Sequence, residues 1–124
     1  MRFCRYVAVA AFAFVGLVVC SAQTGPKGQR LFVSRCGGCH SLDSDKEGPR
    51  LRGVYGRKAG SLSSFGYSDA LRQSQLVSDD RTLDEWLTDP EKRVPGSDMA
   101  FRVPSGDERA AIIAYLKQIS GLSN

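Results

Sequence analysis

The sequence is poor in side chains that bind metals. Its 124 residues include one histidine, two methionines and four cysteines, and two of those cysteines, Cys4 and Cys20, lie in an apolar N-terminal stretch. Beyond that stretch only Cys36, Cys39 and His40 could hold a structural zinc ion, which takes four ligands at suitable spacing. Because the histidine adjoins the second cysteine and neither residue type recurs, a zinc site is disfavoured.

The sequence also lacks the alternating apolar pattern of β-strands, an internal repeat and a low-complexity tract. A thioredoxin-like dithiol lies at a helix start in a βαβ context, and no strand pattern supplies that context here. The length and the absence of repeats predict a single compact domain.

The N-terminal residues 1–22 have the three parts of a secretory signal. Arg2 and Arg5 supply positive charge, residues 6–19 are almost uninterruptedly apolar, and residues 20–22 are the small residues that precede a cut. We expect cleavage after Ala22, which would release residues 23–124 into the periplasm as the mature domain.

Two other interpretations of this N-terminal stretch stay open. A membrane anchor requires an apolar run of about 20 residues, and this run is shorter. Lipidation at Cys20 is the second alternative, although Val19 stands where a lipoprotein signal has a small residue.

The chain has little excess charge of either sign. Removal of Arg2 and Arg5 with the signal leaves 15 of the 17 basic residues against 13 acidic ones, a net charge of +2. This balance argues against nucleic-acid binding and allows at most a local basic patch that steers a partner.

The informative pattern is Cys-Gly-Gly-Cys-His at residues 36–40. Two thiols three positions apart can add to the two vinyl groups of one haem, and the histidine that follows is then held beneath the iron. C-x-x-C-H indicates c-type haem attachment for this reason. The motif predicts one covalent haem c, with Cys36 and Cys39 as thioethers and His40 as an axial iron ligand.

Helical patterns flank a long loop. Residues 27–35 have helical apolar spacing and end in the haem motif, and residues 69–74 and 82–88 are further short helices. The loop 41–68 has too little apolar content to form a core, so we expect it to wrap around another group. The clearest helix follows the capping-box sequence of residues 105–108. Its apolar face consists of Ile112, Ile113, Tyr115, Leu116 and Ile119.

Met99 is the only methionine beyond the signal, and it follows Pro95-Gly96 in a polar turn. A lone methionine usually fills a gap in the core, but this turn is a poor core position and the chain has no second histidine. We therefore predict Met99 as the second axial ligand. A thioether opposite an imidazole raises the potential and leaves no open position for a substrate, which is typical of an electron carrier.

The order of these motifs resembles class I cytochrome c, in the branch that contains mitochondrial cytochrome c and bacterial cytochrome c2. The matching residues span nearly the whole mature length. They are Gly28, Phe32, Cys36, Cys39, His40, Gly48, Pro49, Leu51, residues 53–60 and 65–71, Leu83, Trp86, Leu87, Asp89, Pro90, residues 94–97, Met99, Phe101, Glu108, Arg109 and residues 114–117. The resemblance implies an all-α fold of few helices and long loops around one covalently bound haem.

The resemblance also assigns roles in a haem pocket. The Pro49 carbonyl would accept a hydrogen bond from the His40 ring and fix its orientation. Arg57, Tyr67 and Ser97 would hold a buried haem propionate, which is costly to leave unpaired.

Two aromatic residues complete the pocket that the resemblance implies. Trp86 would lie near the methionine side of the haem, and Phe101 would cover its exposed edge. Gly28 and Phe32 would pack where the first and last helices cross.

The chain departs from the family in two places. Ser78 replaces a tryptophan that binds the propionate in mitochondrial members. Mitochondrial members also surround the haem edge with lysines, whereas this chain has Glu91 and Asp98 beside Arg35 and Lys92. We expect docking to depend less on salt, or to use a different surface.

These observations predict a soluble, monomeric, periplasmic electron-transfer protein that is not an enzyme. It would shuttle single electrons between redox partners such as a quinol-oxidising complex, a terminal oxidase, a photosynthetic reaction centre or a periplasmic dehydrogenase. It would bind no nucleic acid and meet membrane complexes only transiently. A gas-binding sensor or a haem enzyme is the main alternative, and either requires an open sixth position at the iron.

Overall fold

The structure is a computed structural model that describes residues 24–121. The predicted signal peptide and its cleavage site lie outside these described residues. Within residues 24–121 there are five α-helices and no β-strand, and the one bridge pairs Lys58 with Val77 in antiparallel sense. The all-α prediction is confirmed.

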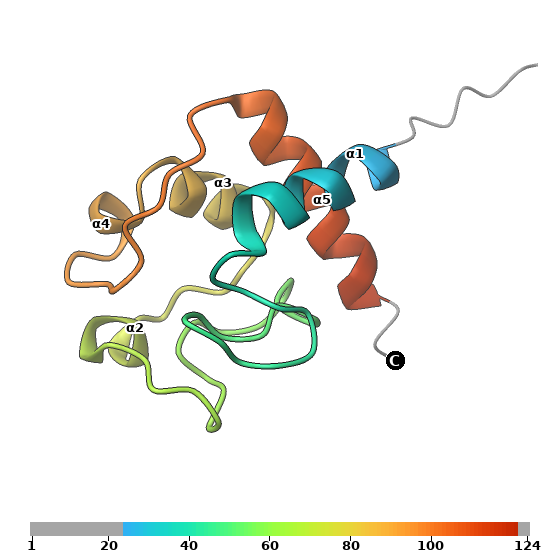
Figure 1. Ribbon diagram of the computed structural model, residues 1–124. Helices are drawn as coiled ribbons and strands as arrows, with labels where there is room; N and C mark the ends of the chain where they lie inside the picture. The colour runs from blue at the N-terminus through green and yellow to red at the C-terminus, as the bar shows by residue number, and fades with distance from the viewer. Residues whose placement is uncertain (1–23, 122–124) are drawn as a thin grey trace, which may run out of the picture.

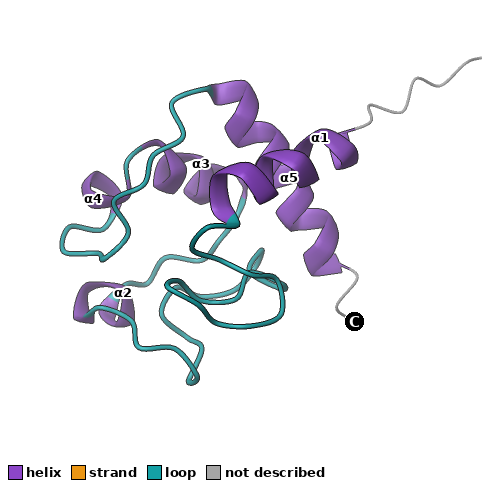
Figure 2. Ribbon diagram, viewed as in Figure 1, coloured by secondary structure: helices purple, strands orange, loops and turns teal. Residues whose placement is uncertain are grey.

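The helices agree with the predicted segments except at their ends. Residues 27–35 belong to a longer element that starts three residues earlier and finishes in a π-helical turn, and a four-residue helix follows the third. The elements are α1 Thr24–Leu31, the π-helix Phe32–Cys36, α2 Asp69–Gln73, α3 Asp80–Thr88, α4 Pro90–Arg93 and α5 Gly106–Gly121. Helices form one half of the molecule, and long loops with α2 form the other (Figure 2). No helix in residues 24–121 has the length and apolar character needed to cross a membrane.

The first and last helices cross in close contact (Figure 1). Gly28 makes the approach possible, because a Cβ at this position would lie 2.3 Å from the Ala111 carbonyl oxygen. One turn further on, the rings of Phe32 and Tyr115 pack with centroids 5.6 Å apart. The contact predicted between these helices is confirmed.

The main hydrophobic core joins this crossing to α3. It combines the apolar faces of three helices with one loop residue, Val103, which is completely buried. Its members are Phe32, Leu83, Leu87, Val103, Ile112, Ile113, Tyr115, Leu116 and Ile119. The five residues predicted as the apolar face of the last helix all belong to it.

Side-chain caps define where the helices begin. Asp79 and Thr82 form a capping box at α3, in which each side chain accepts a hydrogen bond from the other's backbone amide, at 2.7 and 2.8 Å. At α5, Ser105 accepts the Glu108 amide at 3.3 Å. The Glu108 carboxylate instead pairs with Arg35, 3.0 Å away on the π-helix. The capping box of α5 is therefore half formed, and its glutamate connects α5 to the π-helix through an ion pair.

Candidate haem site

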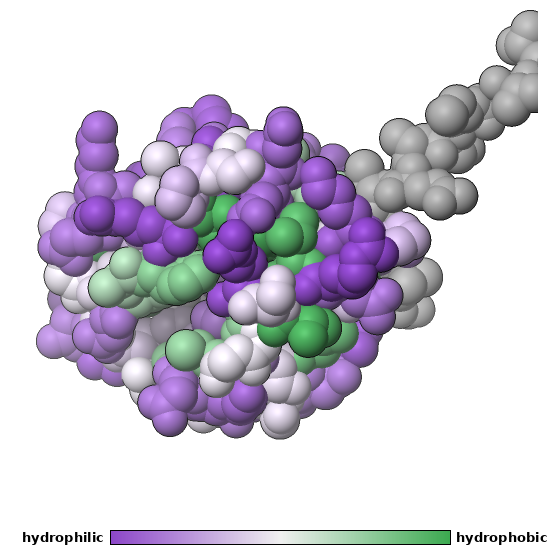
Figure 3. All heavy atoms as spheres, turned by 45° about the horizontal axis from the view of Figure 1, so that its top comes forward, coloured by the Kyte–Doolittle hydropathy of each residue, from purple (hydrophilic) through white to green (hydrophobic). Residues whose placement is uncertain are grey.

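A cavity of about 740 Å³ lies between the helices and the loops. This volume lies in the range of small-molecule and cofactor sites, about 300–1,000 Å³. One face of the molecule is hollowed, with apolar side chains beside the hollow and hydrophilic ones around it (Figure 3). The predicted site residues that line the cavity are Cys36, Cys39, His40, Pro49, Arg57, Tyr67, Trp86, Met99 and Phe101.

The π-helical turn delivers the C-x-x-C-H motif to this cavity. The Gly37 amide donates to the Phe32 carbonyl at 2.9 Å, and the His40 amide donates to the Cys36 carbonyl at 2.8 Å. The turn thus continues tightly from the helix into the motif, so that both cysteines and the histidine line one space. Burial, with a smaller contribution from Cys39, raises the pKa of the Cys36 thiol to about 11. π-Helical turns are frequent at functional sites.

The His40 ring is held by two adjacent loop residues, Gly48 and Pro49. Its Nδ1 donates to the Pro49 carbonyl at 2.8 Å, which leaves Nε2 free to act as a metal ligand. A Cβ on Gly48 would lie 2.2 Å from His40 Cε1, so only glycine leaves room for the ring. Burial lowers the pKa of the imidazole and favours its neutral, metal-binding form. The hydrogen bond predicted between His40 and Pro49 is present.

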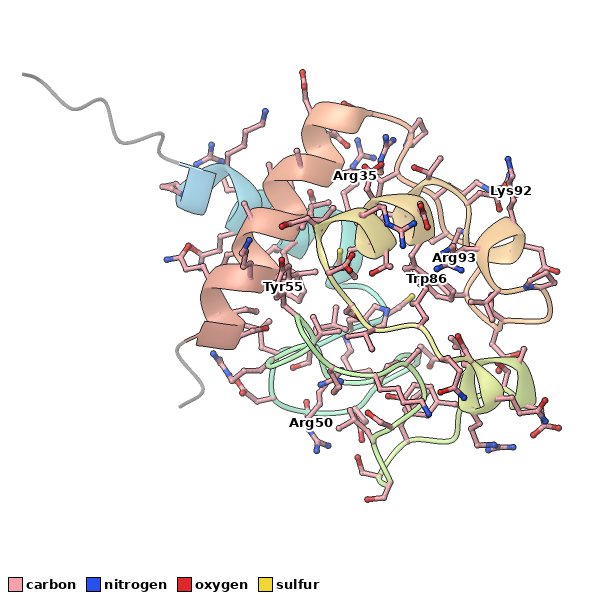
Figure 4. All side chains as sticks on the ribbon, turned by 180° about the vertical axis from the view of Figure 1, so that it is seen from behind. Arg35, Arg50, Tyr55, Trp86, Lys92 and Arg93 are labelled. Carbon is pink, nitrogen blue, oxygen red and sulfur yellow. The ribbon has the colours of Figure 1, made fainter. Side chains whose placement is uncertain are left out.

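Met99 reaches the same cavity from the turn that follows α4. It is half-buried and packs against the main core. The turn is fixed by Gly96, which has a φ of +83° and donates its amide to the Glu91 carboxylate at 3.1 Å. Trp86 extends from α3 toward the loops and lines the cavity too (Figure 4). His40 and Met99, 59 positions apart in sequence, therefore face one space.

Arg57 is a partly buried charged side chain in the cavity wall. The Arg57 guanidinium donates to the backbone carbonyls of Arg50 and Arg52, at 2.9 and 3.2 Å, rather than to a carboxylate. Burial lowers its pKa, yet an arginine stays charged at neutral pH. Tyr67 and Ser78 lie in the same lining and are both buried. A positive charge without a carboxylate partner is suited to an anionic group on a bound cofactor.

Ser97 is the one predicted site residue outside the cavity lining. Its hydroxyl is buried and has no hydrogen-bond partner in the described part of the chain. A buried hydroxyl without a partner is rare in native proteins, so a cofactor group that reaches it would remove an unfavourable feature. The role of Ser97 stays a prediction.

Several residues of the site belong to the family pattern but were given no role from the sequence. They are the apolar loop residues Leu51 and Val54 and, in α2, Leu71. Leu76, between α2 and α3, was not singled out, because tertiary structure is needed to locate it. Gly48 was likewise matched without a role, although a glycine beside a residue predicted to contact the His40 ring often marks a close approach.

The residues present fit a covalently bound haem. The cavity is large and mainly apolar, with two cysteines and a neutral imidazole in its wall and an unpaired arginine. Residues 24–121 contain no group of three or more histidine, cysteine, aspartate and glutamate side chains able to hold a metal ion without such a cofactor.

Comparison with known proteins points to the same cofactor. The profile of the cytochrome c family matches residues 26–120. The chain is 43% identical to cytochrome c of Gibberella zeae over 95 residues, covering 73% of this chain and 90% of the relative. It is 45% identical to cytochrome c2 iso-2 of Magnetospirillum fulvum over 87 residues, covering 68% and 91%.

The fold agrees with a solved structure of the same kind. Cytochrome cH from Methylobacterium extorquens superposes with a TM-score of 0.71 at 40% identity, covering 76% of this chain and 97% of that one. The chain therefore belongs to the cytochrome c family, as a class I c-type cytochrome that carries covalently attached haem c and transfers electrons.

Proposed function

We propose that this cytochrome is a soluble, monomeric carrier of single electrons in the periplasm, with His40 and Met99 as the two axial ligands of its haem iron. The observation that carries the proposal is that Met99, the only methionine of the mature chain, lines the same cavity as His40. A ligand pair of this kind leaves the iron no open coordination position, so the protein would not be an enzyme.

The side chains would divide the work of holding the cofactor. When bound, haem supplies an iron that gains and loses one electron. Cys36 and Cys39 would fix the porphyrin to the chain through thioether bonds, and the Pro49 carbonyl would orient the His40 ring. The Arg57 guanidinium would balance a buried propionate, and the Tyr67 and Ser97 hydroxyls would help to hold it.

The remaining pocket residues would control access to the haem. Trp86 would pack near the methionine ligand, and Phe101, which is 47% exposed, would cover the haem edge. Electrons would cross at that edge, to or from a quinol-oxidising complex, a terminal oxidase, a reaction centre or a periplasmic dehydrogenase.

A redox-partner screen tests this function. The purified reduced protein is mixed with membranes and periplasmic extract of the source organism, and its oxidation is followed by the visible spectrum. Rapid oxidation by one fraction, with carbon monoxide failing to bind the ferrous protein, is the expected result. Rapid binding of carbon monoxide without electron exchange would instead support a gas sensor.

The export prediction has its own experiment. Cell fractionation should place the haem protein in the periplasmic fraction, and N-terminal sequencing should begin at Gln23. Recovery in the membrane pellet with residues 1–22 intact would show a retained anchor.

A further inference from the structure

The mouth of the haem cavity is lined by exposed residues from three parts of the chain. Arg35, Cys39 and Glu47 come from the haem motif and its flanks, Lys58 comes from the loop that follows, and Asp98 and Phe101 come from the methionine turn and the residues just after it. Figure 4 shows Arg35 close to α3 and α5, and Lys92 farther out on α4. This mouth is where a partner would approach the haem.

The arginine at the mouth is already neutralised within the protein. Its Nη2 lies 3.0 Å from a Glu108 carboxylate oxygen, and the side chains are 45% and 25% exposed. A positive side chain held in an ion pair presents little net charge to an approaching protein. Arg35 therefore does not act as a free cation on this surface.

The two carboxylates at the mouth have no such compensation. The ion pairs formed between residues 24 and 121 involve neither Glu47 nor Asp98. Two further cations belong to this surface. Lys46, adjacent to Glu47, donates its ammonium to the Gly37 carbonyl at 2.8 Å, and the exposed Lys58 lines the cavity. We define the charged rim as Arg35, Lys46, Glu47, Lys58, Asp98 and Glu108, which has three positive and three negative charges and a net charge of zero.

Adding the next charged residues around the mouth leaves the net charge of the rim unchanged. Lys92 stands beside Glu91, and Arg102 pairs with Asp89 at 3.0 Å. Each added cation thus comes with an added anion, although the mature chain as a whole carries +2. The positive excess of the protein lies away from the cavity mouth.

The apolar part of the mouth is Phe101. It is one of three large hydrophobic side chains exposed on residues 24–121, the others being Val33 and Val77, and the only one of them that lines the cavity. The centre of a protein interface is depleted of charge and enriched in aromatic residues, and weak redox encounters use small interfaces of this kind.

We propose that the mouth docks a redox protein whose own docking surface carries little net charge and closes on Phe101 by apolar contact. The inference rests on the proposed electron-carrier function, because a sensor has no such partner. Electrostatic steering changes association rates by about 10- to 1,000-fold when opposite charges face each other. A near-neutral rim provides almost none of that steering.

Two small oxidants measure the charge at the mouth without a partner. The reduced protein is oxidised by hexacyanoferrate(III), an anion, and by tris(phenanthroline)cobalt(III), a cation, in separate stopped-flow series. We expect both rates to change by less than about threefold between about 10 and 300 mM salt, across which screening shortens from roughly 30 to below 10 Å. A fall of tenfold or more with either oxidant would overturn the proposal, since it would reveal a strongly charged mouth.

Two double variants test whether the charge that the oxidants sense lies at the cavity mouth. Glu47→Gln with Asp98→Asn changes the net charge of the rim from 0 to +2, and Gln75→Lys with Gln118→Lys adds the same two charges at exposed positions outside the cavity lining. At low salt the first pair should speed the anionic oxidant about two- to threefold, and the second should leave it unchanged. Equal effects of both pairs would contradict a local origin. Reduction potentials are measured for each variant, so that changes in driving force are separated from docking.

Membranes of the source organism serve as the protein partner. The rate at which they oxidise the reduced cytochrome should depend on salt as little as the rates with the small oxidants. This rate should be lower for Phe101→Ser and restored for Phe101→Leu. A steep loss of rate with salt, or no difference between the two Phe101 variants, would refute the apolar docking surface. Failure of the electron-carrier function would look different, as no oxidation by membranes at any salt concentration.

Discussion

The crossing of α1 and α5 allows a quantitative prediction at Gly28. An alanine there would place its methyl carbon 2.3 Å from the Ala111 carbonyl oxygen and 2.7 Å from Tyr115 Cβ. The first of these neighbours is backbone and the second is rigidly attached to it, so no side-chain rotation relieves the overlap. Gly28→Ala therefore forces the two helices apart.

The loss of folding stability follows from the apolar side chains that the separation of the helices exposes. Phe32 and Tyr115 are 6% and 8% exposed in the crossing. Full exposure of one large apolar side chain costs about 1.5–3 kcal/mol, so half exposure of both costs about the same amount. Alanine offsets roughly 1 kcal/mol of this through its higher helix propensity. We expect a net loss of about 0.5–2 kcal/mol, and a midpoint temperature lower by about 2–16 °C.

Guanidinium unfolding of the oxidised holoprotein, followed by far-ultraviolet circular dichroism, measures this loss. Gly121→Ala is the matched control, because a Cβ at Gly121 meets no atom within 4 Å, its φ is not positive, and it lies outside the cavity lining. The control should stay within about 0.5 kcal/mol of the wild type, as surface substitutions do. A Gly28→Ala protein as stable as the wild type would refute the close-packed crossing.

Three further predictions concern acid stability, a buried hydroxyl and the histidine ring. Hydrogen bonds, from a backbone amide to Asp45 and from a lysine ammonium to Asp80, lower both carboxyl pKa values in the folded state. The stability that these two carboxylates contribute is fully present above their unfolded-state pKa near 4, and it is lost as the pH falls through their folded-state pKa values. The denaturant concentration at the unfolding midpoint should therefore stay constant from about pH 7 to 5 and decline below about pH 4. Thr82→Val removes a buried hydroxyl that donates to a backbone carbonyl at 2.6 Å and should cost about 1–3 kcal/mol in urea unfolding. Gly48→Ala should reduce the yield of haem-bearing protein, measured by the ratio of Soret to protein absorbance, because its methyl group would occupy the space of the His40 ring; an unchanged yield would argue against that packing.

Local sequence signals predicted most of the architecture. C-x-x-C-H specifies the cofactor by itself, and the apolar periodicity of residues 112–119 identified the face of α5 that enters the core. The ends of the elements were harder. The helix predicted to begin at residue 27 begins at Thr24 and includes Pro26, in agreement with the preference of proline for the first helical turn.

The residues of the site were predicted, and so was the hydrogen bond between His40 and Pro49, but other contacts were not. His40, Pro49 and Met99 could be named from their order in the chain. The pairing of Arg35 with Glu108 could not, because it joins residues 73 positions apart. A sequence pattern records which charges are present, while their cancellation at the cavity mouth depends on how the helices pack.

Coordination of the iron by Met99 is the central claim, and the ferric absorption spectrum tests it most directly. The account predicts a low-spin spectrum with the weak band at the red end that methionine sulfur produces on ferric iron. This band should be lost in Met99→Ala and retained in Gln118→Lys, an exposed position outside the cavity lining. It also predicts that the wild-type ferrous protein binds carbon monoxide slowly or not at all. A wild-type protein without that band, whose ferrous form binds carbon monoxide rapidly, would contradict the closed sixth position and the electron-carrier function that follows from it.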